Sequence, residues 1–439
     1  MDEPFKDPGI WPALLKTLRH FFPNFRSWLS SVSDPRDPRF TVYPIQYELA
    51  AGILLFLTKL GARRQMRFQF RTPTFIRNLN ALCGTSCKTM LDPDTLAYLA
   101  ERLNPQELEK LRHVMISTLI RKKCFEKDRL QGRWYRVAVD MTGHLVFNQR
   151  HCPHCLTQTH GEKTVYYHMA LEAKLVTPSG FCLSLATEFV ENSGPEMAKQ
   201  DCELKALARL LPRLKQDYPQ LSICLLMDGL YACGPVFELC RKNGWQFIIT
   251  FKEGSAPAVF QDYEQLKAIG ASPHRYVEGD VLREYHWVNG VDFSGHSVNV
   301  LECLETVASK VPTRFVWVMS LPVDEHNHVK LATDGGRQRW KIENQGFNIQ
   351  KNNGYELEHA YSEDSQALKN FYLLLQIAHI IAQLLEKGLL AKKLRKDIGS
   401  IRNVARWLLE ELRRVAPDLA RLEQELTEQK IQIRFADSS

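Results

Sequence analysis

Three acidic residues stand where a folded chain could gather them to hold metal ions. Asp140 ends the apolar run VAVD, and Asp228 ends the apolar run SICLLMD. An acid at the end of a buried strand lies at the carboxyl edge of a sheet, where open α/β sheets bind ligands. Two adjacent carboxylates repel each other unless a cation offsets their charge, and Mg²⁺ prefers oxygen ligands. Glu343, on a predicted helix, would add a third carboxylate. Each aspartate alone could instead cap the turn or helix that follows it.

The segment around Glu343, GRQRWKIENQGFNIQKNNGY (residues 336–355), predicts a helix rich in basic and amide side chains. Arg339 and Glu343 stand four residues apart, so one interpretation is a surface ion pair worth about 0.2–0.5 kcal/mol. The other is that Glu343 joins the two aspartates while Arg339, whose planar fork fits a phosphate, binds DNA instead of Glu343. Gln350 is expected on the same side of this helix as Arg339 and Glu343.

The rest of the chain predicts the elements that would position these acids. Residues 1–130 carry amphipathic, helix-like runs. From Tyr135 onward the pattern changes to three short strands, then helix, buried strand, helix and buried strand, which implies a parallel pair with a right-handed crossover. Residues 253–334 break that alternation, are strand-rich, and contain an Asn289-Gly290 hairpin signal. More helices are expected over residues 364–428, with a frayed end.

This order of elements, with Asp140 on the first strand, Asp228 after the fourth and Glu343 on the next core helix, is similar to the RNase H-like catalytic core. The spacings of 88 and 115 residues, with a strand-rich insertion before Glu343, resemble those of bacterial insertion-sequence DDE transposases of the cut-and-paste kind. The resemblance covers roughly residues 40–390.

The signature of that family around the glutamate is Tyr-x2-Arg-x3-Glu-x6-Lys. Arg339 and Glu343 match it, whereas Gly336 takes the place of the tyrosine and Gln350 that of the lysine, with Lys351 one residue late. These departures affect the residues that would bind the flanking phosphates and any DNA hairpin intermediate. They do not change the three acids.

The resemblance implies an α/β protein. It would have an RNase H-like mixed sheet core and an inserted β-rich subdomain, preceded by a helical N-terminal domain and followed by C-terminal helices. The expected parts are a basic, DNA-binding helical domain at 1–130, the first part of the core at 131–252, the insertion at 253–334, the second part of the core with the Glu343 helix at 335–390, and C-terminal helices and tail at 391–439.

The resemblance also implies an activity. A DDE transposase cuts phosphodiester bonds at the ends of a mobile element and joins the freed 3′-OH to target DNA, using two Mg²⁺ or Mn²⁺ ions held here by Asp140, Asp228 and Glu343. It acts as a synapsed homodimer on DNA in the bacterial cytoplasm, at the nucleoid. The alternatives are an RNase H-fold nuclease or resolvase without strand transfer, and an inert DNA-binding protein derived from a transposase.

Basic residues suggest where DNA would be held. The net charge is +7, and residues 1–130 contain 21 Lys/Arg against 13 Asp/Glu, which indicates either a nucleic-acid partner or simply a basic soluble domain. Trp340 could stack on a displaced base or belong to the core. The other predicted DNA contacts are Lys252, Lys351 and a set of arginines expected on one helix face, Arg64, Arg67 and Arg71.

A second metal site is suggested by RHCPHCLTQTH. Cys152-x2-Cys155 with His160 offers three ligands at zinc-knuckle spacing, with His151, His154 or His168 as a fourth. The alternative is a pair of free cysteines in a polar loop. Eleven cysteines without regular spacing, and an acidic start without an apolar stretch, favour the reducing cytoplasm. The most apolar run, NFYLLLQIAHIIAQLLEKGLL, is predicted to be too short and too polar for a membrane span, so no membrane partner is expected.

Overall fold

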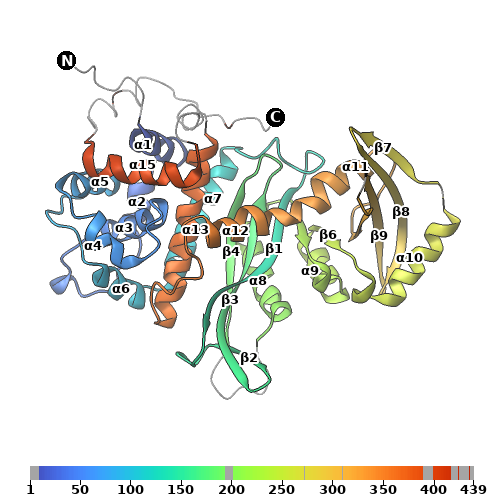
Figure 1. Cartoon of the computed structure of the whole chain (residues 1–439), viewed down its shortest axis with the longest axis horizontal. Helices are drawn as coiled ribbons and strands as arrows, with labels where there is room; N and C mark the ends of the chain where they lie inside the picture. Colours follow the sequence, from blue (N-terminus) through green and yellow to red (C-terminus); the bar gives the residue numbers. More distant parts are fainter. Residues whose placement is uncertain are drawn as a thin grey trace.

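The N-terminal helices and the strand-rich segment of this chain lie at opposite ends of the molecule. The computed structural model describes residues 9–192, 201–270, 272–308, 310–388 and 399–416, with Gln424 and Phe435. A ten-stranded mixed sheet runs through the molecule, with helices gathered at one end and the strand-rich segment at the other (Figure 1). The fold is therefore mixed α/β, as predicted.

Helices occupy most of residues 10–121, as the amphipathic runs predict. Several begin with a proline preceded by a residue whose side chain accepts a backbone N–H; Thr72, Asp92 and Asn104 serve in this way. The helices are α1 (Ile10–Phe21), α2 (Phe25–Ser30), α3 (Ile45–Leu57), α4 (Met66–Gln69), α5 (Pro73–Cys83), α6 (Pro93–Arg102) and α7 (Pro105–Arg121).

A buried ion pair in this helical end links stability to pH. Glu48 of α3 is fully buried against Arg36, yet burial outweighs the arginine and raises the pKa of Glu48 to about 7. The native protein therefore keeps a proton that the unfolded chain releases between its usual pKa of 4.5 and about 7, so stability falls as pH rises through that window. We expect the urea midpoint to fall between about pH 5 and pH 8, and less steeply in Glu48→Gln. Equal slopes would contradict this assignment.

The predicted succession of three strands, helix, strand, helix and strand is present. β3 is antiparallel to both β1 and β4, whereas β1, β5 and β6 are mutually parallel in that order. One strand, β2, was not predicted, because its sequence LTQTH was interpreted as loop. The elements are β1 (Tyr135–Phe147), β2 (Leu156–His160), β3 (Lys163–Val176), β4 (Cys182–Val190), α8 (Glu203–Asp217), β5 (Ile223–Met227), α9 (Gly234–Asn243) and β6 (Gln246–Thr250).

The strand-rich segment extends the same sheet. β6 pairs antiparallel with β10, and the sheet continues through β9 and β8 to β7. A helix, α10, precedes these strands and lies beside β8 (Figure 1). The elements are α10 (Pro257–Ile269), β7 (His274–Glu278), β8 (Val281–Phe293), β9 (His296–Val307) and β10 (Thr313–Met319).

The predicted hairpin turn at Asn289-Gly290 is wrong. These residues form a bulge inside β8, where the register with β9 shifts between Val288 and Val291. The turn lies at Ser294-Gly295, which both have positive φ (56° and 80°), as a tight two-residue hairpin turn requires. Asn289 instead exchanges two hydrogen bonds with the backbone of Val323, which fixes the bulge against the chain after β10.

The long apolar run forms the central helix α13 (Ser365–Lys387), capped by Asp364. By length and composition it could cross a membrane, but 94% of its most apolar window is buried inside the protein. It packs against α3, α6, α7 and β4 and joins the helical end to the sheet (Figure 1). Helix α15 (Ile401–Arg414) follows, and the predicted frayed end lies, apart from Phe435, outside the described residues.

Candidate functional site

Asp140 and Asp228 lie level with each other on neighbouring parallel strands. β1 and β5 pair from Tyr135↔Ile223 to Ala138↔Leu226, and the same register carried two residues further matches Asp140 with Asp228. Adjacent strands are about 4.8 Å apart, so the two acids are neighbours at the point where β5 ends. Asp140 does not end its strand as predicted, because β1 continues through Phe147 in its pairing with β3. Asp228 also caps a turn, since its side chain accepts a hydrogen bond from the Leu230 N–H at 2.9 Å.

Glu343 reaches the same place through Arg339. The arginine Nη1 lies 3.4 Å from Asp140 Oδ2 and 2.8 Å from Glu343 Oε1. Because both carboxylates contact one nitrogen atom, their oxygens are no further apart than the sum of these distances. The structure therefore brings Asp140 and Glu343 together at Arg339, and the strand register places Asp228 next to Asp140. The expectation that Arg339 would not pair with Glu343 is wrong in this structure, because Arg339 forms ion pairs with both Glu343 and Asp140.

The acids differ in exposure and in ease of ionisation. The side chain of Glu343 is 47% exposed and that of Asp140 is 17% exposed. Burial raises the pKa of Asp140 to about 7, against the lowering effect of Arg339, and the charges of Glu343 and Glu203 raise it further. A carboxyl so reluctant to lose its proton beside other acids is typical of a site arranged around an added positive charge.

A fourth acid, Glu203, belongs to this group and was not predicted from the sequence. It opens α8 and accepts a hydrogen bond from the phenol of Tyr231, and burial followed by the charge of Asp228 raises its pKa. The topology could have revealed it. α8 leads into β5 and runs antiparallel to it, so α8 begins at the sheet edge where β5 ends, next to Asp228.

The segment that carries Arg339 and Glu343 is helical but irregular, unlike the single helix predicted over residues 336–355. Two wide π turns flank a tight 3₁₀ turn, and such π turns are frequent at functional sites. The turns are α11 (His328–Lys330), the π turn η5 (Leu331–Gly335), the 3₁₀ turn η6 (Gly336–Trp340), the π turn η7 (Ile342–Phe347) and α12 (Asn348–Asn352).

This irregularity places Gln350 away from Glu343, contrary to the prediction. Gln350 is fully buried, accepts a hydrogen bond from Lys174 at 3.3 Å, and contacts Gln376 and His379 at 2.9 Å. A π turn holds about one residue more than an α turn, so every side chain after η7 is rotated around the axis. Gln350, in the place of the family's lysine, therefore belongs to the interior.

Gly336, in the place of the family's tyrosine, sits against the ring of Trp317 on β10. A Cβ atom added there would lie 2.3 Å from that ring, so no larger residue fits without a shift of the whole segment. We expect Gly336→Ala to lower the free energy of unfolding by about 1–3 kcal/mol, because the added methyl group overlaps the Trp317 ring. Gly254→Ala is the matched control, because a Cβ there meets nothing within 4 Å. An unchanged urea midpoint in Gly336→Ala would contradict the close contact.

A hollow of about 770 Å³ opens beside η6, between β6, β10 and η7. Trp340 lines it and is 53% exposed, so the alternative that Trp340 belongs to the core is wrong. Lys252, at the end of β6, is exposed and lines the same hollow with Arg337 and Lys341. Aromatic and basic side chains together suit a flat, negatively charged ligand such as a displaced nucleotide.

Three of the four remaining predicted DNA contacts have acidic partners. α3 ends at Leu57, and η2 (Arg63–Gln65) and α4 follow after a turn, so Arg64, Arg67 and Arg71 do not share one helix face. Arg67 and Arg71 lie 2.7 and 3.0 Å from Asp92, and Lys351 lies 2.7 Å from Glu358. In the part of the chain that the structure describes, only Arg64 of these four shows no ion pair.

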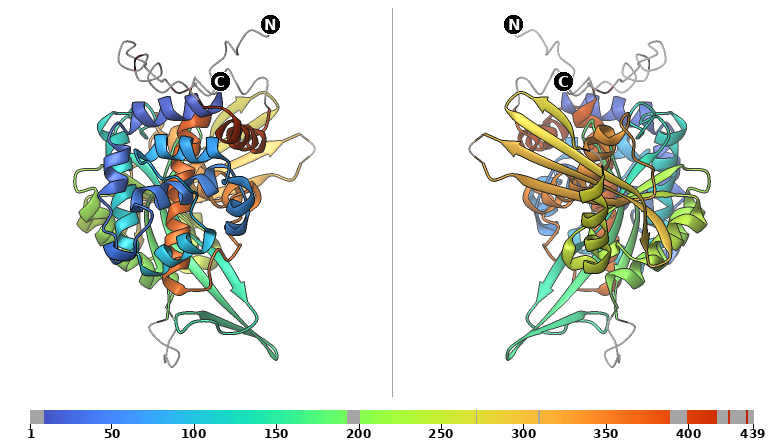
Figure 2. Two further views of the ribbon diagram at one scale, coloured as in Figure 1. Left: turned by 90° about the vertical axis from the view of Figure 1, so that its left-hand side faces the viewer. Right: turned by 90° about the vertical axis from the view of Figure 1, so that its right-hand side faces the viewer.

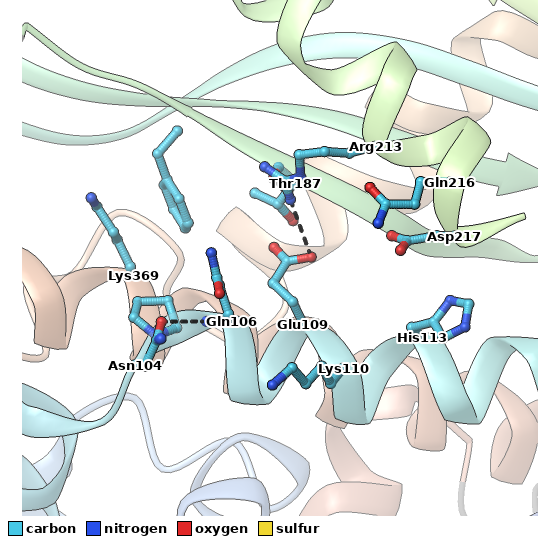
Figure 3. Close-up of a pocket in the computed structure, with 12 residues that line it drawn as sticks. Asn104, Gln106, Glu109, Lys110, His113, Thr187, Arg213, Gln216, Asp217 and Lys369 are labelled. Atoms are coloured by element: carbon cyan, nitrogen blue, oxygen red, sulfur yellow. Dashed lines mark hydrogen bonds and ion pairs between the residues drawn. The ribbon is translucent and has the colours of Figure 1, made fainter. Parts of the chain in front are cut away.

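A second hollow, of about 560 Å³, lies between α7, α8 and the edge strand β4 (Figure 3). Its wall mixes Glu109 and Asp217 with Arg213 and Lys369, and Arg213 lies 3.5 Å from Glu109. None of the four acids described above lines it. Because its charges oppose each other, it offers no uniform field for a nucleic acid.

The predicted cysteine site has a different set of histidines. His151, Cys152, Cys155 and His168 bring one ligand atom each to within 4.8 Å of one another, and this cluster could bind a metal such as Zn²⁺. The backbone of His160 pairs with Lys163, five residues before His168 on β3, which places it roughly 16 Å along the hairpin. His160 as third ligand is therefore a wrong prediction on backbone grounds; its side chain lies outside the described residues.

A scan against protein-family models and a search of curated proteins found no match to this chain.

Proposed function

We propose that this chain is a metal-dependent DNA transposase of the DDE kind, with Asp140, Asp228 and Glu343 as its catalytic acids. The observation that supports the proposal is the placement of Asp140 and Glu343 on Arg339, with Asp228 level with Asp140 on the next strand, although the three acids are 88 and 115 positions apart in the sequence. A stabilising role alone would not require acids on three separate elements to be placed together, because like charges destabilise one another.

The arrangement of strands supports an RNase H-like core. In spatial order the five strands of this part are β4, β3, β1, β5 and β6, with β3 antiparallel to its neighbours and the last three parallel. The strands β7 to β10 add to the outer edge of β6, and the chain then returns to place η6 and η7 over β1 and β5. An insertion of this kind lets a distant acid return to the ends of the two central strands.

The donor set fits two Mg²⁺ ions better than a softer metal, because every ligand is a carboxylate oxygen and Glu343 leaves the site open to solvent. Two such ions supply an activated water and a stabilised leaving oxygen for in-line displacement. Glu203, held by Tyr231, keeps a further negative charge near Asp140 and Asp228.

Arg339 has a second role in this proposal. Without DNA it neutralises Asp140 and Glu343, and its side chain is 12% exposed. Its planar fork suits a phosphate as well as a carboxylate, so DNA entering with cations would release it to bind the backbone at the reacting bond. Trp340, Lys252 and Arg337 around the neighbouring hollow would hold a displaced strand by stacking and by charge.

Two other functions share parts of this geometry. An RNase H-fold nuclease or resolvase would use the same acids for hydrolysis only, and an inert DNA-binding protein would keep the basic surface without cutting. A dimer that holds two element ends, a bacterial cytoplasmic location at the nucleoid, and the absence of a membrane partner are parts of the transposase proposal.

The test is a coupled assay of cutting and joining. The full chain is incubated with Mg²⁺ or Mn²⁺, labelled DNA from the ends of its own element, and a supercoiled target plasmid. We expect nicking or double-strand cutting at the element ends and covalent transfer of label to the plasmid. Cutting without transfer would favour the nuclease, whereas end binding without cutting under either metal would favour the inert protein.

A further inference from the structure

Four of the six ligand-atom separations in the cysteine and histidine cluster on the hairpin side of the sheet are close to those of a tetrahedral metal site, and the two from His151 to the sulfurs are within 4.8 Å. Cys152 Sγ lies 3.5 Å from both Cys155 Sγ and His168 Nε2, Cys155 Sγ lies 3.6 Å from His168 Nε2, and the Nε2 atoms of His168 and His151 are 3.1 Å apart. Zinc bonds of about 2.3 Å to sulfur and 2.0–2.1 Å to nitrogen, at tetrahedral angles, require about 3.8 Å between sulfurs, 3.6 Å between sulfur and nitrogen, and 3.3 Å between nitrogens.

The four ligands come from two places in the chain. His151, Cys152 and Cys155 lie in the connection between β1 and β2, and His168 lies inside β3, level with Leu145 of β1. Cys155 and His168 are buried, and the two thiols are not joined by a disulfide.

A surrounding shell of contacts orients these ligands. Asn192, just after β4, donates its side-chain amide to the Cys155 carbonyl at 2.8 Å, and its N–H to the His154 carbonyl at 3.2 Å. His154 turns away from the cluster, with Nδ1 3.0 Å from the Asn192 carbonyl, so it is not the fourth ligand. Outer contacts of this type are typical of metal sites.

We propose that His151, Cys152, Cys155 and His168 bind one structural Zn²⁺ ion that fastens the β1–β2 connection to β3. Two thiolates and two neutral imidazoles offset the charge of the ion, which suits a half-buried place. All four positions are filled by protein, so the site has no opening for a reacting water and is structural. Binding releases the two thiol protons to solvent. The site secures the long β2–β3 hairpin, which projects from the rest of the sheet (Figure 2).

This inference stands apart from the transposase proposal, and its test needs no DNA. The full chain is purified under reducing conditions without chelator, and bound metals are measured by elemental mass spectrometry. We expect about one Zn²⁺ per chain. Replacement by Co²⁺ should produce the visible absorption of a tetrahedral site with thiolate-to-metal charge transfer. A folded, reduced protein that neither carries Zn²⁺ nor takes it up on addition would overturn the proposal.

Matched variants identify the ligands. Cys152→Ser should lose the bound Zn²⁺ and the cobalt charge-transfer band, whereas Cys202→Ser, which changes an exposed cysteine, should keep both. His160→Gln should also keep the metal, and loss there would restore His160 as a ligand at the expense of His168. Limited proteolysis serves as a second readout, with cleavage between residues 148 and 168 expected to increase at least severalfold after chelation. Unchanged zinc in Cys152→Ser would refute the ligand set.

Discussion

Replacing Asp140 with asparagine is expected to abolish both DNA cutting and strand transfer while leaving binding to the element ends within a fewfold of the wild type. The substitution keeps the size of the side chain and removes the charge that a metal ligand needs. Two-metal catalysis supplies several kcal/mol of transition-state stabilisation, and about 4 kcal/mol corresponds to a rate loss of roughly 10³-fold. Asp228→Asn and Glu343→Gln should behave alike, because each removes one carboxylate from the same edge of the sheet.

The control is Asp262→Asn, which alters an exposed acid on α10 and should leave both steps unchanged. DNA binding is measured separately, by gel shift in Ca²⁺, so that a variant that cannot cut is distinguished from one that cannot bind DNA. The expected pattern is three inactive, DNA-binding variants beside an active control. Retained cutting in any one of the three would remove that residue from the site and leave too few ligands for two ions.

Asp140 and Asp228 were predicted from the sequence because a strand of apolar residues that ends in an acid is a local pattern. They are neighbours because β1 and β5 pair in parallel. Such a pairing can be expected from the sequence, because parallel strands in one sheet are joined by right-handed crossovers. Glu343 required more, since its place depends on the segment from 253 to 334 returning the chain to the same edge. The resemblance supplied that expectation, and the ion pairs of Arg339 agree with it.

The errors came where the backbone departs from regular geometry. No periodic pattern distinguishes an α-helix from one with π turns, so the position of Gln350 could not follow from spacing alone. The bulge at Asn289-Gly290 uses the same positive φ as a hairpin turn, and only the register of β8 with β9 tells them apart. His168 was one of three candidates for the fourth ligand, but it lies on β3, 13 residues after Cys155, so choosing it over His160 required the sheet itself.

Exposed charges were the other source of error. Arg67 and Arg71 were predicted to face DNA because basic residues at helical spacing suggest a basic surface. Their partner, Asp92, is the N-cap of α6 and is placed there by its own local role. A sequence shows the sum of charges in a segment, but it does not show which opposite charge will fold against each of them.

The second large effect is expected in stability, from Arg112→Met. Arg112 is fully buried on α7, donates to Ser184 at 2.8 Å and to Thr187, and pairs with Glu109 three residues earlier. Ser184 and Thr187 in turn donate to Glu172, a fully buried acid that stands opposite Asp140 in the β1–β3 pairing. Removing the guanidinium would leave Glu109 with only the more distant Arg213, at 3.5 Å, and Glu172 with only Lys174, at 3.9 Å, as cationic partners. Breaking a buried pair in this way costs about 3–5 kcal/mol.

Urea unfolding followed by circular dichroism measures this loss as a lower midpoint. Arg241→Met is the matched control, because Arg241 also pairs with a glutamate three residues earlier on a helix but is exposed, and it should change the midpoint little. If the cost arises from stranded charge, then Glu109→Gln and Glu172→Gln added to Arg112→Met should restore part of the stability. If it arises from lost packing, they should not. Restored stability would mean that charge is the main link between the helical end and strands β3 and β4. β3 is the strand that pairs with β1, which carries Asp140.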